Sequence, residues 1–194
     1  MLRPHLGWCA ALLAIASAVA QPPFRPKERP VIGLKAGNML PNLGGTFLQG
    51  GKDPARGALY QAVVLGGERS AVVFLRGEDD KEAFEIIKAL DARKWPRDKA
   101  RLWVVATGGD DKALKEKFKP LERVGLWRTQ DHDARDAKRL GLGEGEAGPL
   151  LLMRHGKVEK AYREPRKNVS EGRVAELVKE AEAHLMPAPP KPTG

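Results

Sequence analysis

The stretch SAVVFLRGEDDKEAFEIIKAL, residues 70–90, decides the expected fold. Its first part, AVVFL at residues 71–75, is apolar without alternation, which is typical of a strand buried on both faces. After an acidic turn, apolar residues recur from Ala83 to Leu90 with the spacing i, i+3, i+4, i+7 of one helix face. The stretch therefore predicts a central strand that leads into an amphipathic helix lying on the sheet.

The next part of the chain repeats this order of strand and helix. LWVVA, residues 102–106, predicts a second buried strand, and Asp110 or Asp111 is placed to cap a short helix that runs through Phe118. A further strand is expected at 124–127, and a short helix at 131–140. Strands that alternate with helices favour a parallel sheet.

The C-terminal part predicts antiparallel strands and a final helix. Apolar residues at 150–153 and 158–162 flank His155-Gly156, which indicates a hairpin turn between two strands. Ser170 is placed to cap a helix whose apolar stripe ends at Leu185. The loop before the hairpin, residues 141–148, is rich in glycine.

The segment before the central strand gives weaker signals. Residues 42–47 predict a short hairpin because they contain Asn and two glycines. Asp53-Pro54 is typical of a helix start. The apolar side of that helix is expected to comprise Ala58, Leu59, Ala62, Val63 and Leu65.

The two ends of the chain differ from its middle. Residues 1–20 have Arg3, an apolar run and the small residues Ala18-Val19-Ala20, which predicts a cleaved signal peptide and a periplasmic or secreted protein. After cleavage, we expect no segment that spans a membrane. Residues 21–30 are a Pro-rich linker and residues 186–194 a Pro-rich tail, so the globular domain is expected at 31–185.

Composition narrows the possible functions. The chain has 34 basic and 25 acidic residues in 194, a formal charge of +9, and it lacks any nucleic-acid recognition motif. We therefore expect no nucleic acid as a partner, and an unknown protein or an anionic component of the cell envelope instead. Its one cysteine, Cys9, lies in the predicted signal peptide, so the mature protein is expected to be free of cysteine.

The pattern as a whole resembles the thioredoxin-like superfamily, in particular its exported thioredoxin-like and peroxiredoxin-like branches. The likeness covers about residues 39–185 and rests on AVVFL with its helix, on LWVVATGGDDKAL, on DHDARDAKRLGL and on GPLLLMRHGKVEKAY. It implies an α/β fold: a three-layer sandwich in which helices cover both faces of a central mixed sheet. It also implies that Pro149 is the candidate cis-proline.

The chain departs from this family at the redox site. By the resemblance, the reactive cysteines would fall near Asp79 and Glu82, at the start of the helix where the helix dipole stabilises a thiolate. A carboxylate cannot exchange disulfides or reduce a peroxide. We therefore expect a redox-inactive protein that is neither a thiol-disulfide oxidoreductase nor a thiol peroxidase.

The acidic turn has two interpretations. Asp79 or Asp80 caps the helix, since a short carboxylate accepts hydrogen bonds from the free amides of the first turn. The alternative is a cysteine-independent enzyme that uses acid/base or metal-assisted chemistry through Asp79, Asp80 and the loop 131–133. We favour a binding or accessory protein without catalytic, cofactor or metal residues. Its candidate interaction surface comprises Gly77, Glu78, Asp79, Asp80, Lys81, Gly148 and Pro149.

Two further groups of residues have ordinary explanations. His155 and His184 are expected at the surface, since neither has a Ser or Cys nearby in the sequence to act as a nucleophile. Six basic residues surround the predicted hairpin and either bind an anionic partner or discourage edge-to-edge aggregation. They are Arg154, Lys157, Lys160, Arg163, Arg166 and Lys167.

Overall fold

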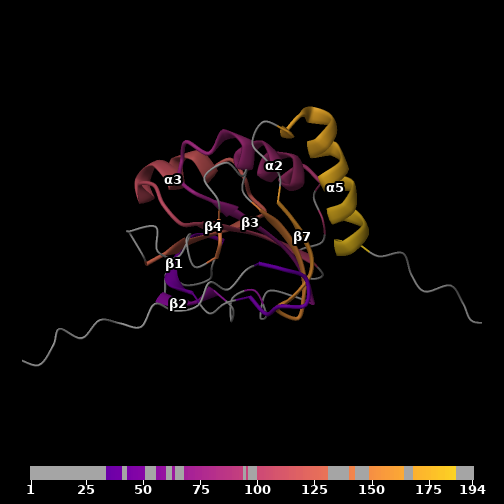
Figure 1. The fold of residues 1–194 in the computed structure, drawn as a ribbon. Helices are drawn as coiled ribbons and strands as arrows, with labels where there is room; N and C mark the ends of the chain where they lie inside the picture. The colour runs from indigo at the N-terminus through magenta and orange to yellow at the C-terminus, as the bar shows by residue number, and fades with distance from the viewer. Residues whose placement is uncertain are drawn as a thin grey trace, which may run out of the picture.

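The structure is a computed structural model that describes residues 34–40, 43–50, 56–59, 63, 68–93, 95, 100–130, 140–142, 149–163 and 168–186. One seven-stranded sheet crosses the described part of the chain (Figure 1). Its strands in spatial order are β2 (Arg56–Ala58), β1 (Gly44–Gln49), β5 (Val124–Thr129), β4 (Ala100–Ala106), β3 (Arg69–Leu75), β6 (Leu150–Arg154) and β7 (Lys157–Tyr162).

The sheet is mixed, as expected. β3, β4 and β5 are parallel to one another, whereas β6 pairs antiparallel with β3 and with β7, and β1 pairs antiparallel with β5 and with β2. β3 has a neighbour on each side and is buried from Ser70 to Leu75. This position explains the continuous apolar run, because side chains on both faces of the strand enter the core.

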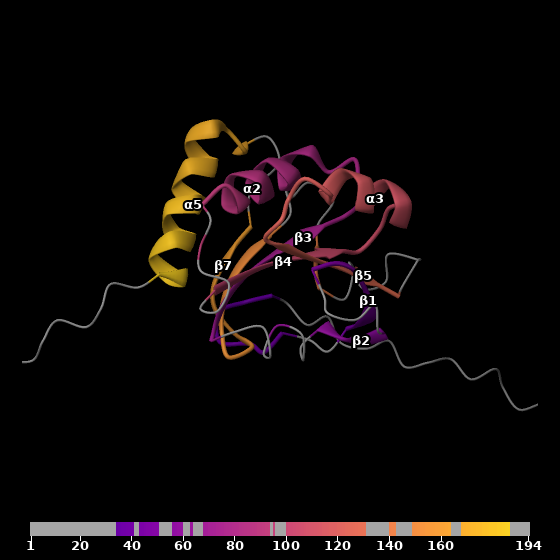
Figure 2. The ribbon, with the colours of Figure 1, turned by 180° about the vertical axis from the view of Figure 1, so that it is seen from behind.

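Three helices lie on one face of the sheet: α2 (Lys81–Asp91), α3 (Asp111–Phe118) and α5 (Glu171–Leu185) (Figures 1 and 2). They begin where the sequence predicts. Asp80 caps α2, Asp110 caps α3 and Ser170 caps α5, each by accepting a hydrogen bond from a backbone N–H three residues later. The core under these helices contains Val73 and Leu75 of β3 and the apolar stripes of α2 and α5.

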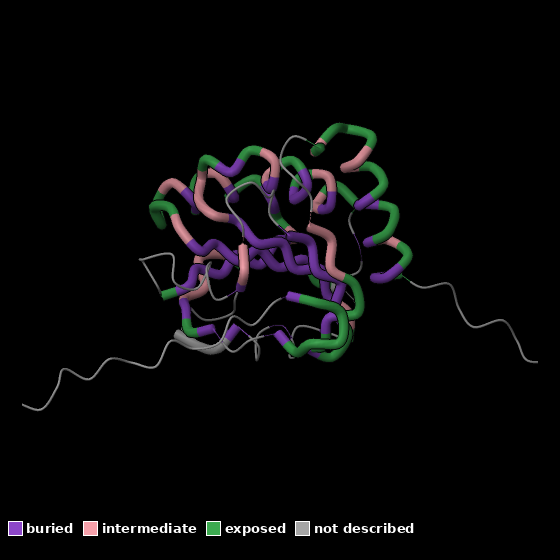
Figure 3. Tube along the Cα trace, in the orientation of Figure 1, coloured by how far each residue is buried: buried purple, intermediate pink, exposed green. Residues whose placement is uncertain are grey.

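The opposite face of the sheet has a second core. Val72 and Phe74 of β3 point into it, together with Trp103 and Trp127 of the neighbouring strands. The N-terminal segment covers this face with Leu34, Leu40 and Leu43, and Leu59 and Val63, both helical, are buried there. Figure 3 shows the buried sheet between these two covering layers. The structure thus has the three-layer α/β arrangement that the sequence implies.

The predicted hairpin is confirmed. β6 and β7 are joined by His155 and Gly156, whose φ angles are 48° and 77°. Two successive positive φ angles match the twist of antiparallel strands, and glycine adopts them without a steric cost. Met39 forms a bridge with Lys157, so residues of the N-terminal segment cover the start of the edge strand β7.

The prediction for residues 42–47 is wrong. Gly44–Gln49 is a single strand that pairs with β5 on one side and with β2 on the other. Gly45 has no room for a side chain in this strand, because a Cβ atom there would lie 2.4 Å from the indole nitrogen of Trp127. The glycines therefore allow a close approach within the sheet instead of making a turn.

Two other predictions need correction. Ala58 lies in β2, so the helix expected from Asp53-Pro54 does not include it, although Leu59 and Val63 are helical and buried as expected. His184 is not a surface residue, since the inner side of α5 buries it to 8% exposure. The helix expected at 131–140 and the loop expected at 141–148 fall mostly outside the described residues.

Candidate binding surface at the start of helix α2

Asp80 stands directly before α2, next to Asp79, near which the resemblance would put the first reactive cysteine. Its side chain is 3% exposed. Oδ1 accepts a hydrogen bond from the backbone N–H of Ala83 at 3.4 Å, and Oδ2 accepts one from the N–H of Arg76 at 3.3 Å. The prediction of a capping carboxylate is therefore confirmed for Asp80, while Asp79 is exposed. The carboxylate of Asp80 therefore accepts from one amide of the first turn of α2, that of Ala83, and from one amide before the helix, that of Arg76.

Glu78 joins this turn to the loop that precedes α3. Its Oε2 accepts a hydrogen bond from the backbone N–H of Asp110 at 3.1 Å, and its carbonyl oxygen accepts one from Nζ of Lys117. The same Nζ lies 4.5 Å from the ring centroid of Phe84, within the range of a cation–π contact. Glu78 therefore serves mainly as a bridge between two loops.

The loops on either side of this bridge touch through glycine. A Cβ atom on Gly108 would lie 2.1 Å from the carbonyl oxygen of Arg76. A Cβ atom on Gly109 would lie 2.1 Å from Oε2 of Glu78, and Gly109 has a φ of +92°. Only residues without a side chain fit in these two places, so the glycine pair allows the two loops to interlock.

The structure divides the predicted interaction surface into two parts. Asp79 and Lys81 are exposed and Gly77 and Glu78 are half-buried, so these residues are open to solvent at least in part. Asp80 and Pro149 are buried instead, and the carbonyl oxygen of Pro149 accepts a hydrogen bond from the N–H of Phe74 at 3.1 Å. Gly148 lies outside the described residues, so a cis bond before Pro149 stays a prediction.

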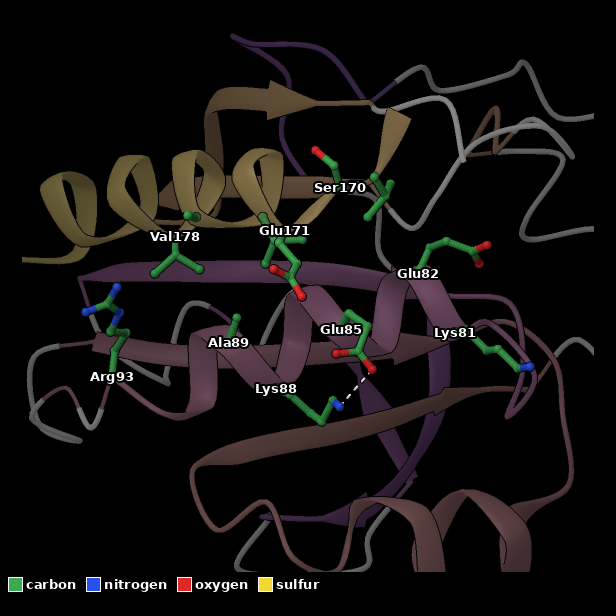
Figure 4. A pocket seen from close by; sticks show the side chains of 12 residues that line it. Lys81, Glu82, Glu85, Lys88, Ala89, Arg93, Ser170, Glu171 and Val178 are labelled. Carbon is green, nitrogen blue, oxygen red and sulfur yellow. Dashed lines mark ion pairs between the residues drawn. The ribbon is translucent and has the colours of Figure 1, made fainter. Parts of the chain in front are cut away.

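An open groove starts beside Lys81 and runs between α2 and α5 (Figure 4). It encloses about 700 Å³, within the range of about 300–1,000 Å³ that is usual for ligand pockets. Its residues are Lys81, Glu82, Glu85, Lys88, Ala89 and Arg93 from α2 and the residues just after it, and Val169, Ser170, Glu171, Val174, Ala175 and Val178 from α5 and the residues just before it. The sequence does not predict the groove, because the half-exposed position of Val174 in the apolar stripe of α5 depends on how α5 packs beside α2.

The charges of the groove are unevenly paired. Lys88 forms an ion pair with Glu85 at 2.7 Å, and Arg93 pairs with Glu182 at 3.6 Å. Among the described residues, no ion pair is found for Glu82 or Glu171. Figure 4 shows Glu171 pointing from α5 toward α2. The end of the groove near the start of both helices therefore has two carboxylates, in the first turns of α2 and α5, beside the exposed Lys81.

Two of the six basic residues around the hairpin form ion pairs with described residues. Arg154 pairs with Glu68 at 2.8 Å, and Lys160 pairs with Glu180 at 2.7 Å. The hydrogen bond from Lys160 is the main cause that lowers the pKa of the Glu180 carboxyl, and the Tyr162 hydroxyl adds a second one at 3.0 Å. Arg166 and Lys167 fall outside the described residues. An anionic partner at this segment stays a prediction.

Within the described ranges, no group of three or more His, Cys, Asp or Glu side chains lies close enough together to hold a metal ion. Residues 131–133 fall outside those ranges, so their approach to Asp79 is untested. No helix in the part of the chain that the structure describes is both long and apolar enough to cross a bilayer.

Comparison with known proteins identifies the fold. No protein-family model matches the sequence, and no curated protein does. Among solved structures, a putative protein disulfide isomerase from Bacteroides thetaiotaomicron is 18% identical with a TM-score of 0.54, and the match covers 78% of this chain and 90% of that one. Reduced Prx3 from Vibrio vulnificus in complex with H2O2 is 18% identical with a TM-score of 0.53, over 78% of this chain and 98% of that one.

A peroxiredoxin-like protein from Aquifex aeolicus gives a similar result, with 17% identity and a TM-score of 0.52 over 77% of this chain and 88% of that one. At these identities the likeness establishes the fold. The described part of the chain lacks cysteine, since the one cysteine of the sequence is Cys9. The chain is therefore a protein of the thioredoxin-like fold whose helix α2 begins with a buried carboxylate instead of a redox cysteine.

Proposed function

We propose that this chain is an exported, redox-inactive thioredoxin-like protein that binds a partner protein in the cell envelope. The observation that carries the proposal is the position of Asp80. A redox site on this fold needs a nucleophilic sulfur and free amide donors at the start of the helix. Here the buried carboxylate of Asp80 accepts a hydrogen bond from one of those donors, the N–H of Ala83, and a second from the N–H of Arg76 before the helix.

The binding surface in this proposal is the groove between α2 and α5, together with the exposed Asp79 and Lys81 at its start. Ala89, Val174 and Val178 provide its apolar contacts, and charged side chains surround them. α2 has 11 residues, a length of about 16 Å at 1.5 Å per residue. An extended peptide that lies along the whole of α2 would therefore have about five residues.

We infer that the ligand is an extended segment of a partner protein with a Lys or Arg near its end. The carboxylates of Glu82 and Glu171, for which the described residues provide no ion pair, favour a cation at the start of the groove, and the apolar residues favour aliphatic side chains further along. The alternative, an enzyme that uses Asp79, Asp80 and the loop 131–133, has less support, because both oxygens of Asp80 accept hydrogen bonds from the backbone.

A matched pair of substitutions on α5 tests the proposal. Ala175 is exposed within the groove, and Ala183 is exposed on the same helix outside it. The parent, Ala175→Trp and Ala183→Trp proteins are used to capture proteins from an envelope extract, and the captured partner is then purified for affinity measurement. We expect Ala175→Trp to weaken binding at least tenfold, because the indole fills the groove, while Ala183→Trp binds like the parent. Equal binding by all three proteins would rule out the groove as the binding surface.

A further inference from the structure

Three basic residues lie side by side across the sheet, at the end where β3 begins. Arg69 of β3 is paired with Arg154 of β6, and Arg154 is paired in turn with Lys157 of β7. Residues directly opposite each other in an antiparallel pair point to the same face of the sheet. Like charges in such pairs repel each other, so this row of cations does not stabilise the fold by itself.

The acids beside this row balance only part of its charge. Glu68 pairs with Arg154 at 2.8 Å, and the carboxylate of Glu159 lies 3.3 Å from the imidazole of His184. Lys157 is exposed, and the described residues provide no ion pair for it. This end of the sheet therefore has positive charge that is available to an anionic partner.

The N-terminal segment adds a cation and an exposed methionine to the same end. Met39 forms a bridge with Lys157, and the N–H of Gly37 donates a hydrogen bond to the carbonyl oxygen of Val158 at 2.8 Å. Lys35, in the same turn, is exposed, and no ion pair is found for it within the described ranges. Met39 is 47% exposed, although it lies beside the edge of the sheet.

The end of α5 brings a second exposed methionine to this place. Nη1 of Arg69 donates a hydrogen bond to the backbone oxygen of His184 at 3.0 Å, so the last turn of α5 lies at the start of β3. Met186, directly after α5, is 44% exposed. In the part of the chain that the structure describes, Met39 and Met186 are the only large apolar side chains that are exposed. Both therefore lie at the end of the sheet that has the row of cations.

Exposed apolar side chains beside available cations match the surface of an anionic bilayer. Lys and Arg attract the negative headgroups of such a surface, and the attraction acts over about a Debye length. Methionine has a long, flexible and apolar side chain, which can enter the boundary between headgroups and acyl chains. A soluble polyanion would use the cations and leave the methionines in water.

We propose that this end of the molecule docks on the surface of an anionic lipid bilayer. The docking face lies on the bilayer and does not cross it. It is independent of the proposed binding function, since none of its residues lines the groove between α2 and α5. The face comprises Lys35, Met39, Arg69, Arg154, Lys157 and Met186.

Co-sedimentation with vesicles tests this proposal. The vesicles contain either phosphatidylcholine alone or phosphatidylcholine mixed with phosphatidylglycerol. We expect the parent to bind the mixed vesicles, to be released by salt, and to bind phosphatidylcholine alone about tenfold more weakly. Lys157→Glu should weaken binding to the mixed vesicles by about tenfold or more, because each cation near the surface contributes about fivefold and the reversal changes two charges. Met186→Ser should weaken binding without changing its dependence on salt.

Lys112→Glu is the matched control. Lys112 is an exposed lysine of α3, a helix that follows the carboxyl end of β4 at the opposite edge of the sheet. The substitution changes the net charge equally and should bind within about twofold of the parent, because its site is more than a Debye length away from the docking face. Lys157→Glu should unfold at or above the temperature of the parent, since it removes the repulsion with Arg154, so unfolding does not explain its weaker binding.

Four results would overturn the proposal. They are equal binding by Lys157→Glu and Lys112→Glu, equal binding of the parent to both kinds of vesicle, binding by Met186→Ser that matches the parent, and absence of binding by the parent. Retention of the parent on heparin together with absence of vesicle binding would identify a soluble anionic partner instead. All the proteins share the same N-terminal segment, so differences between them arise at the substituted residues.

Discussion

Asp79 and Asp80 are neighbouring residues of the same type with opposite environments. Asp80 is buried and bonded to two backbone amides, whereas Asp79 is exposed. The difference arises because only one residue can stand at the cap position, where the side chain points back over the first turn of the helix. Asp80 therefore has a structural role as the helix cap, whereas the exposed carboxylate of Asp79 is accessible to a partner.

We predict that Asp80→Ala lowers the free energy of unfolding by about 0.5–2 kcal/mol, because two backbone N–H groups lose their acceptor. Asp80→Asn should lose less, since the amide oxygen still accepts one of these bonds. Asp79→Ala is the matched control and should change stability by less than about 0.5 kcal/mol. Urea denaturation of the three variants measures these differences, and equal stability of Asp80→Ala and the parent would show that the cap has no structural role.

Gly109 and Gly37 form a second informative pair. Both have a φ of +92°, but a Cβ atom on Gly37 has no neighbour within 4 Å, while one on Gly109 would clash with Glu78. We predict that Gly109→Ala destabilises the protein more than Gly37→Ala does. Both substitutions put an L-residue at a strained positive φ, but only Gly109→Ala also breaks the bridge between the loops. Thermal denaturation of the two variants provides the comparison. Equal losses would mean that the loops are not held together through Glu78.

At the scale of secondary structure, the β6–β7 hairpin combines a favourable and an unfavourable residue in its turn. Gly156 accepts a positive φ without cost, but His155 has a φ of 48°, in a region that few residues other than glycine adopt. Asn tolerates this conformation better than most residues. The turn of the hairpin is therefore a place where stability can be increased without changing the core.

We predict that His155→Asn raises the midpoint of thermal unfolding, with a gain of up to about 1 kcal/mol at this single position. His155→Ala removes the same imidazole without introducing a residue suited to a positive φ, so it should give no such gain. Differential scanning calorimetry of both variants in the same buffer separates these outcomes. A similar gain in both would show that the imidazole itself is unfavourable.

At the scale of the whole molecule, the chain has the thioredoxin-like fold, and its described part contains no cysteine. The cores on the two faces of the sheet are built from apolar residues of distant segments, so the fold does not need a reactive residue at the start of α2. The helix start needs an anion or a polar cap, and a carboxylate meets this need as well as a thiolate does. Fold and function can therefore separate at this one site.

We predict that the purified chain neither reduces insulin disulfides nor consumes peroxide above the background rate. Cys9→Ser should behave like the parent, because Cys9 lies in the predicted signal peptide and far in sequence from α2. Both proteins are assayed with a thioredoxin as the positive control. Thiol-dependent turnover in the parent that disappears in Cys9→Ser would contradict the proposal of a redox-inactive protein.

The sequence by itself determined the elements of the fold that depend on local chemistry. The continuous apolar run of β3, the helical stripe of α2 and the caps at Asp110 and Ser170 were all predictable, because periodicity and capping involve residues a few positions apart. The hairpin at His155-Gly156 was predictable for the same reason. The resemblance to thioredoxin-like proteins placed these elements in order and located the departure at the start of α2.

The tertiary structure decided what depends on segments that meet in space. It placed β1 as a strand inside the sheet, bonded Glu78 to the loop before α3, and formed the groove between α2 and α5. It also enclosed His184 between two strands that lie far from it in the sequence. These features follow from the contacts between distant residues, and a local pattern of side chains does not contain that information.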